Sequence, residues 1–170
     1  MILRDLVSCL DKVTACGPMD LEVSSLTADS RAAAPGLLFA AIRGTTLDGH
    51  RFIGDVLKAG VTAILAETAP PADLAPGIAW LHVPDSRAAL SEMASLIEGH
   101  PWSDLAMAGV TGTNGKTTTA FLIHHVMKTA WHRAGLLGTI LVDDGETAGP
   151  AKHTTPGSIE LSALLARMRD

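Results

Sequence analysis

The sequence predicts an α/β fold in two lobes, with mostly parallel strands. Short apolar runs bounded by Gly or Pro recur along its 170 residues and alternate with segments whose apolar residues have helical spacing. Helices that alternate with strands in this way cover the faces of a parallel sheet. A helix-breaking stretch, Gly99-His100-Pro101, interrupts the pattern, so we expect one lobe at residues 1–100 and a second at 101–170.

The first lobe is expected to begin with an amphipathic helix that ends before Gly17-Pro18. Leu3, Leu6, Val7 and Leu10 recur there at helical spacing. Alternating or continuous short apolar runs then predict strands, and longer periodic segments predict helices. The strands are expected at residues 21–26, 36–42, 61–66 and 78–83, and the helices at 50–59 and at 87–98, the latter capped by Ser86.

The second lobe repeats the alternation. An apolar run at Leu105–Val110 predicts a strand before a helix at 116–131, and a strand at 136–142 is expected before a helix at 159–169. The acidic run at 143–146 is expected to be a solvated turn rather than a metal site, because no motif accompanies it.

The composition excludes several classes of protein. The 13 Lys+Arg against 18 Asp+Glu give a net charge of −5, which excludes a strongly basic nucleic-acid arm, and 4% aromatic residues leave little material for base stacking. No apolar run approaches the roughly 20 residues of a membrane span. Cys9 and Cys16 form no CxxC pair, as expected for reduced thiols. We therefore expect a cytoplasmic protein without nucleic-acid or membrane partners.

The strongest chemical signal is Gly109–Thr119, which reads GVTGTNGKTTT between the expected strand and helix. Glycines let backbone N–H groups converge on an anion, and the helix adds the positive end of its dipole. Lys116 would bridge the terminal phosphates of a nucleotide, and the Thr117 hydroxyl would bind Mg²⁺. The expected nucleotide-binding residues are Gly112, Thr113, Asn114, Gly115, Lys116, Thr117 and Thr118. Kinases, GTPases, motors and ligases share such loops, so the loop alone does not define the reaction.

The sequence of this loop resembles the nucleotide loop of the Mur ligase family, including Val110 where the general pattern has Gly. Other segments agree with that family in order and spacing, and together the matches cover essentially the whole chain. These segments are Thr27–Arg31, Pro35–Ala41, Gly44–Ile53, Gly135–Ile140, His153–Pro156 and Glu160-Leu161. The likeness is to the members that add the third amino acid of the peptidoglycan stem.

The resemblance implies an ATP- and Mg²⁺-dependent ligase. ATP would phosphorylate the terminal carboxylate of UDP-N-acetylmuramoyl-L-alanyl-D-glutamate, and the amine of an incoming amino acid, meso-diaminopimelate or L-lysine, would displace the phosphate. Phosphoryl transfer needs positioned charge more than covalent help, so Lys116 is the expected catalytic residue.

The resemblance also implies substrate-binding residues in both lobes. The first lobe, as the UDP-binding domain, would hold uridine and diphosphate, and the start of the central P-loop ATPase domain would contact the muramoyl peptide. The implied residues are Ala28, Ser30, Thr45, Thr46 and Leu47 for the first group and His153, Thr154 and Thr155 for the second. Without the resemblance, the residue types in both sets are as typical of turns as of binding sites. His50 is expected to be a loop or capping residue rather than a catalyst.

Family members are much longer than this chain, so the resemblance implies that these residues alone are catalytically inactive. The complete enzyme is expected to be monomeric. Alternatives stay open. The chain could belong to another Mur-type ligase, such as a dipeptide-adding or folylpolyglutamate-like enzyme, although the Asp29-Ser30-Arg31 and His153–Pro156 segments argue against both. It could also be a non-catalytic module for UDP-muropeptides or nucleotides, or a generic nucleotide switch or kinase.

Overall fold

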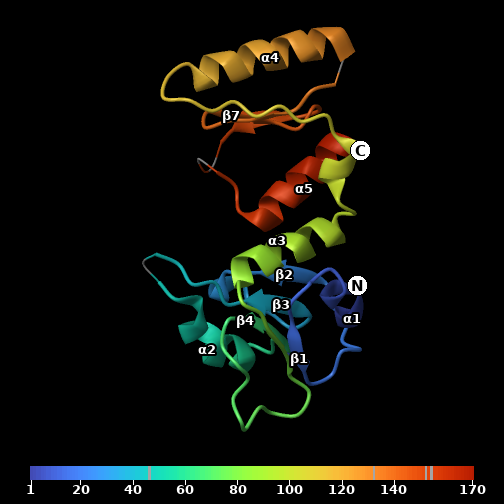
Figure 1. Cartoon of the computed structure of the whole chain (residues 1–170), viewed down its shortest axis with the longest axis vertical. Helices are drawn as coiled ribbons and strands as arrows, with labels where there is room; N and C mark the ends of the chain where they lie inside the picture. The colour runs from blue at the N-terminus through green and yellow to red at the C-terminus, as the bar shows by residue number, and fades with distance from the viewer. Residues whose placement is uncertain (46, 132, 152, 154) are drawn as a thin grey trace. The chain divides into compact units, whose positions relative to one another are not determined.

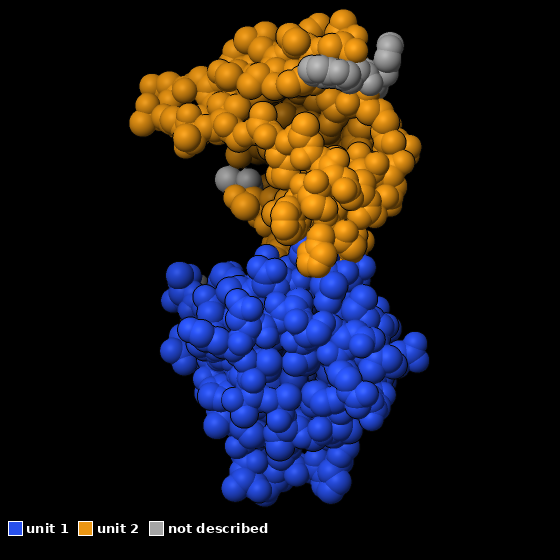
Figure 2. Space-filling view, turned by 45° about the vertical axis from the view of Figure 1, so that its right-hand side comes forward, with its two compact units in different colours: residues 1–97 blue, residues 98–170 orange. Residues whose placement is uncertain are grey.

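The chain forms two compact units, residues 1–97 and 98–170 (Figures 1 and 2). The structure, a computed structural model, describes residues 1–45, 47–131, 133–151, 153 and 155–170. None of the helices in these ranges has the length and hydropathy that a bilayer crossing demands.

A five-stranded sheet in the order β1-β5-β4-β3-β2 organises the first unit. The pairs from β2 to β5 are parallel and only β1 runs antiparallel, which confirms the α/β class with a mostly parallel sheet. The strands are β1 (Thr14–Cys16), β2 (Ser25–Thr27), β3 (Leu37–Ala40), β4 (Ala63–Ala66) and β5 (Ala79–His82). The exposed edge strand β1 was not predicted, because it has no apolar alternation. The strand expected at 21–26 begins only at Ser25, and Glu22 instead forms an isolated antiparallel bridge with Ile2.

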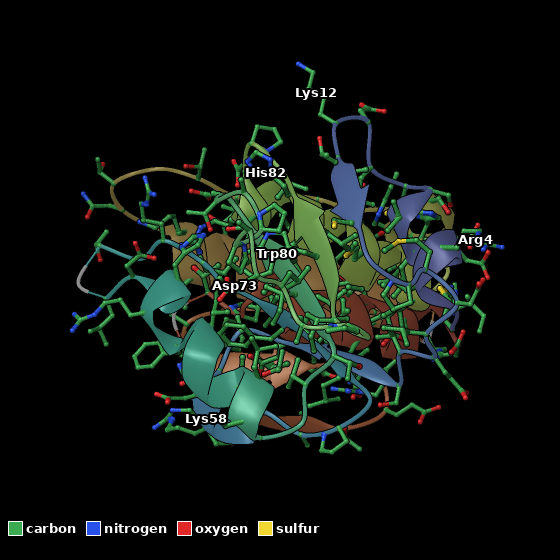
Figure 3. The ribbon with its side chains drawn as sticks, turned by 90° about the horizontal axis from the view of Figure 1, so that it is seen from below. Arg4, Lys12, Lys58, Asp73, Trp80 and His82 are labelled. Carbon is green, nitrogen blue, oxygen red and sulfur yellow. The ribbon has the colours of Figure 1, made fainter. Side chains whose placement is uncertain are left out.

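Helices cover both faces of this sheet. On one face Phe39, Ile64 and Trp80 pack with Val56 of α2 (Ile53–Lys58). Strand alternation turns their buried neighbours to the opposite face, where α3 (Ser86–Ile97) contacts β3 and β4. Figure 3 shows Trp80 within the unit while Lys58 projects outward. The remaining elements are α1 (Leu3–Val7) and the short 3₁₀ helices η1 (Ser30–Ala32) and η2 (Gly49–Phe52).

The predicted cap of α3 is wrong by one residue. The carboxylate of Asp85 accepts hydrogen bonds of 2.9 Å from the backbone N–H groups of Arg87 and Ala88, as an N-cap does. Ser86 is completely buried instead, and its hydroxyl donates to the Ala41 carbonyl at 2.8 Å. A buried carbonyl needs a hydrogen-bond donor. The Ser86 hydroxyl is that donor for Ala41, and Asp85 caps the helix.

The second unit combines helices with a three-stranded antiparallel sheet, so parallel strands were wrongly expected in this lobe. Gly138 donates to the Leu141 carbonyl at 2.9 Å and thereby splits the expected strand 136–142 into a hairpin. The helices expected at 116–131 and 159–169 are present. The elements are η3 (Pro101–Asp104), α4 (Lys116–Trp131), β6 (Leu136–Leu137), β7 (Leu141–Asp143), β8 (Ala148–Pro150) and α5 (Ser158–Arg169).

Two further expectations for this unit are wrong. Leu105–Val110 is not a strand, because no strand in the described part of the chain pairs with it, and a strand needs a neighbour for its backbone groups. The expectation of a solvated turn is wrong for Asp143 and Asp144, which are buried and form ion pairs with Lys128 at 2.9 Å and Arg167 at 3.0 Å, whereas Glu146 is exposed.

Candidate functional site

The glycine-rich loop leads directly into α4 and presents its backbone to solvent. Gly112 and Gly115 have φ values of 144° and 76°, in the region that side chains disfavour. No heavy atom lies within 4 Å of a Cβ built on Gly115, so its backbone conformation rather than crowding requires glycine. The predicted nucleotide-binding residues Gly112–Thr118 are thus a continuous exposed segment, made of the loop and the start of α4.

The first turn of α4 offers donors to an anion. The N–H of Thr119 donates to the Gly115 carbonyl at 2.9 Å, so the N–H groups of Lys116, Thr117 and Thr118 lie ahead of the first intrahelical bond. These groups coincide with the positive end of the helix dipole, and α4 has 16 residues over which to build that dipole. Nucleotide phosphates fit such a site.

Lys116 adds a positive charge to this turn. Its Nζ donates to the carbonyl oxygens of Gly112 at 2.6 Å and Thr113 at 3.3 Å, so the side chain folds back across the loop. The ammonium therefore lies against the carbonyl oxygens of the glycine-rich loop. The Thr117 hydroxyl in the same turn is the type of oxygen ligand that Mg²⁺ accepts beside phosphates and water. Within the described ranges, no cluster of three His, Cys, Asp or Glu side chains could hold a metal ion.

The predicted uridine diphosphate residues lie at one edge of the sheet in the first unit. Ala28 and Ser30 follow β2, and Thr45 and Leu47 follow β3. Since β2 and β3 are adjacent and parallel, their carboxyl ends reach the same edge, where open α/β sheets bind ligands. Thr46 lies outside the described residues.

Ser30 is held in η1 by an ion pair. Asp29 caps this short helix by accepting the Arg31 N–H at 3.0 Å, and its two carboxylate oxygens bind the Arg31 guanidinium at 2.9 and 2.7 Å. These hydrogen bonds lower the pKa of Asp29 to about 2. The carboxylate therefore stays charged at neutral pH and keeps the turn that presents Ser30.

A tight turn between residues 43 and 48, of which 43–45, 47 and 48 are described, presents Thr45 and Leu47. The Gly44 N–H donates to the Leu47 carbonyl and the Gly49 N–H to the Ile42 carbonyl, both at 2.9 Å. A Cβ on Gly49 would lie 2.7 Å from the Ile42 nitrogen, so the closing backbone segments pack too tightly for a side chain. The backbone alone therefore closes this turn.

His50 is a structural residue at the base of this turn, but it lies within η2, which Asp48 caps, rather than at the expected loop or capping position. Its backbone and ring hydrogen bonds lower the pKa of Asp48, and its Nε2 accepts the Glu67 N–H at 3.0 Å. The sequence did not single out Glu67 or Arg43, which approach each other at 3.9 Å. Their position in the sequence could have indicated them, because each residue follows the carboxyl end of a central strand.

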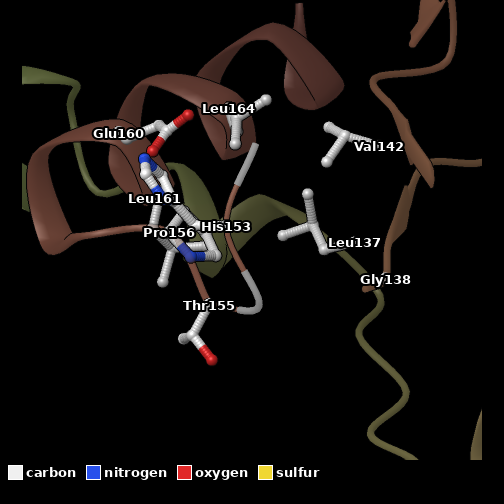
Figure 4. A pocket seen from close by; sticks show the side chains of 9 residues that line it. All are labelled: Leu137, Gly138, Val142, His153, Thr155, Pro156, Glu160, Leu161 and Leu164. Carbon is white, nitrogen blue, oxygen red and sulfur yellow. The ribbon is translucent and has the colours of Figure 1, made fainter. Parts of the chain in front are cut away.

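The second unit holds a pocket of about 260 Å³ that brings together His153 and Thr155 with an apolar wall (Figure 4). Glu160 supplies a further polar group. Thr154 lies outside the described residues. The other lining residues are Leu137, Gly138, Val142, Pro156, Leu161 and Leu164.

Comparisons with known proteins identify relatives of both units. Residues 22–97 match the model for the Mur ligase family, catalytic domain, and residues 110–170 match the Mur ligase middle domain. The UDP-N-acetylmuramoyl-L-alanyl-D-glutamate--2,6-diaminopimelate ligases of Bacteroides fragilis and Geobacter sulfurreducens are each 39% identical over 170 residues. These alignments cover 100% of this chain but 35% and 33% of the relatives, so the chain spans about a third of their length.

Solved structures show the same fold. A UDP-N-acetylmuramoyl-L-alanyl-D-glutamate--2,6-diaminopimelate ligase matches with a TM-score of 0.69 at 20% identity, over 99% of this chain and 33% of that one. MurF from Acinetobacter baumannii matches with a TM-score of 0.62 at 21% identity and the same coverage. MurF from Thermotoga maritima, in complex with ADP, matches with a TM-score of 0.52 at 26% identity over 85% of this chain and 30% of that one.

Proposed function

Because the chain belongs to the Mur ligase family, we propose that it supplies the UDP-binding domain and the start of the ATP-binding domain of a ligase acting on UDP-N-acetylmuramoyl-L-alanyl-D-glutamate. The amino acid added would be 2,6-diaminopimelate, as in the names of the ligases of Bacteroides fragilis and Geobacter sulfurreducens. The observation that carries the proposal is their 39% identity across the whole chain, which includes both candidate sites.

The proposed reaction forms an amide bond through an acyl phosphate. The γ-phosphoryl group of ATP passes to the terminal carboxylate of the dipeptide, and the amine of the amino acid then attacks the acyl carbon, loses a proton and displaces inorganic phosphate. Lys116 and the N–H groups of the first α4 turn hold the phosphates and stabilise the charge that moves during transfer. Mg²⁺, held in part by Thr117, would supply further positive charge to the same oxygens.

The two units divide the substrates in this proposal. Residues 1–100 bind the UDP end through Ala28, Ser30 and the 45–47 segment, whose hydroxyl and backbone N–H groups suit a uracil edge and phosphate oxygens. Residues 101–170 bind ATP, and the pocket with His153 and Thr155 contacts the muramoyl peptide. Thr46 and Thr154 complete these sets by resemblance.

The complete enzyme is proposed to be cytoplasmic and monomeric, and these 170 residues alone to lack ligase activity. The fold likeness to MurF at 21% identity does not favour a dipeptide-adding ligase, because it reports the shared architecture alone.

A binding experiment tests the substrate assignment. Calorimetric titration of the chain with UDP-N-acetylmuramoyl-L-alanyl-D-glutamate is compared with UDP-N-acetylglucosamine, which has the nucleotide but no muramoyl peptide. The proposal expects the muropeptide to bind more tightly. Equal affinity for both would contradict recognition of the peptide, and binding of neither would contradict the UDP site.

A further inference from the structure

We propose that His50 is a positioning residue for the turn 43–48, linking that turn to β4 through Asp48 and Glu67 so that it is preorganised for the UDP-linked substrate. This inference rests on the proposed function, which assigns the turn to uridine diphosphate binding. His50 does not contact the substrate in this account. It sets where the turn lies.

The hydrogen bonds of His50 define one tautomer. Its Nε2 lies 3.0 Å from the Glu67 backbone nitrogen, which can only donate, so Nε2 carries no proton. Its Nδ1 lies 2.6 Å from Asp48 Oδ1, an acceptor, so Nδ1 carries the proton. The ring is 10% exposed, and both nitrogens are therefore occupied by protein partners in a mostly buried position.

The two partners of His50 converge again on the first residue of the turn. Arg43 Nε lies 3.8 Å from Asp48 Oδ2 and 3.9 Å from Glu67 Oε2. Asp48 closes the turn against Arg43 in an antiparallel bridge. The turn is thus linked to the residue after β4 by the imidazole on one side and by a guanidinium between two carboxylates on the other.

Glu67 is itself fixed at the edge of the sheet. Its Oε1 accepts the Ser86 N–H at 3.2 Å and lies 3.1 Å from the Ser86 hydroxyl. That hydroxyl donates to the Ala41 carbonyl just after β3. The chain of contacts from Asp48 through His50 and Glu67 therefore ends on rigid elements, the carboxyl ends of β3 and β4 and the start of α3.

The contribution of His50 can be separated from the closure of the turn. The backbone bonds from Gly44 to Leu47 and from Gly49 to Ile42 close the turn without the imidazole. What the imidazole adds is the placement of the turn relative to β4. A site held in its bound geometry avoids the entropic cost of ordering on binding, so the loss of this link should weaken substrate affinity more than it weakens the fold.

Three substitutions separate the two hydrogen bonds. His50→Gln places an amide oxygen near the position of Nε2 and retains the Glu67 bond, and His50→Asn places an N–H near Nδ1 and retains the Asp48 bond. His50→Ala removes both. Val56→Ala is the matched control, because it creates a cavity in the core of the same unit and leaves the network intact.

The test measures the Kd of the whole chain for UDP-N-acetylmuramoyl-L-alanyl-D-glutamate by calorimetry, the stability of each variant by urea unfolding, and the ring ¹⁵N shifts of His50 by NMR. We expect His50→Ala to raise the Kd about 10-fold, the scale of a lost hydrogen bond, while Val56→Ala destabilises the unit at an unchanged Kd. His50→Gln should recover part of the affinity, and the wild-type shifts should report a neutral ring protonated at Nδ1.

The inference is overturned if His50→Ala binds as tightly as the wild type, if Val56→Ala weakens binding equally, if His50→Gln recovers none of the affinity, or if Nε2 carries a proton. If the wild-type chain itself does not bind the muropeptide, the proposed function fails and the inference with it. The two failures are distinguishable because only the second abolishes muropeptide binding by the wild-type chain.

Discussion

Removal of the Lys116 ammonium should weaken Mg²⁺-ATP binding and leave the fold and the UDP-linked substrate site intact. The contacts that Lys116 loses in Lys116→Ala are two exposed hydrogen bonds to loop carbonyls, at 2.6 and 3.3 Å. Alanine is a good helix former at the start of α4, so the cost to folding is small. A hydrogen bond from a charged donor to a phosphate contributes about 1.5–3 kcal/mol, which corresponds to a rise in Kd of about 10- to 150-fold.

Calorimetric titration of Lys116→Ala with Mg²⁺-ATP and, separately, with UDP-N-acetylmuramoyl-L-alanyl-D-glutamate provides the assay. Lys58→Ala is the matched control, because it removes the same charge from an exposed lysine of α2. We expect an unchanged muropeptide Kd in both variants and a raised ATP Kd in Lys116→Ala alone. Unchanged ATP affinity, or an equal loss for both ligands, would refute the assignment of Lys116 to the phosphates.

Further predictions concern the edge of the sheet in the first unit. Ser86→Ala should lower the free energy of unfolding by about 1–3 kcal/mol in urea titrations, because the buried Ala41 carbonyl loses its donor. Arg31→Ala should return the pKa of Asp29 from about 2 toward 3.8 in an NMR pH titration. Because that pKa is depressed in the folded state, the stabilisation by this pair should be complete above pH 3.8 and be lost as the pH falls toward 2. Gly49→Ala should weaken muropeptide binding in the same calorimetric assay, since its methyl group would collide with backbone at 2.7 Å.

The parts of the fold that local sequence determines were predictable. The periodic segment from Lys116 to Trp131 forms α4, and the glycine-rich loop lies at its first turn, because phosphate loops depend on consecutive residues. The parallel strands of the first unit were likewise visible as short apolar runs, since both of their faces are buried.

Features that depend on distant partners were not predictable. The run at Leu105–Val110 has the composition of a strand, but strand pairing is a tertiary property. Asp144 looked like part of a solvated turn because its partner, Arg167, is 23 residues away. His50 was expected at a loop or capping position but lies in η2, and its contact with Glu67, 17 residues further on, required the structure.

The most direct test of the division between the two units is an NMR titration of backbone amides, with UDP-N-acetylmuramoyl-L-alanyl-D-glutamate and Mg²⁺-ATP added separately. We expect the nucleotide to shift amides of residues 109–119 and the UDP group of the muropeptide to shift those of residues 28–50. If both ligands shift the same set of amides, or if Mg²⁺-ATP shifts only the first unit, the two-site account is wrong.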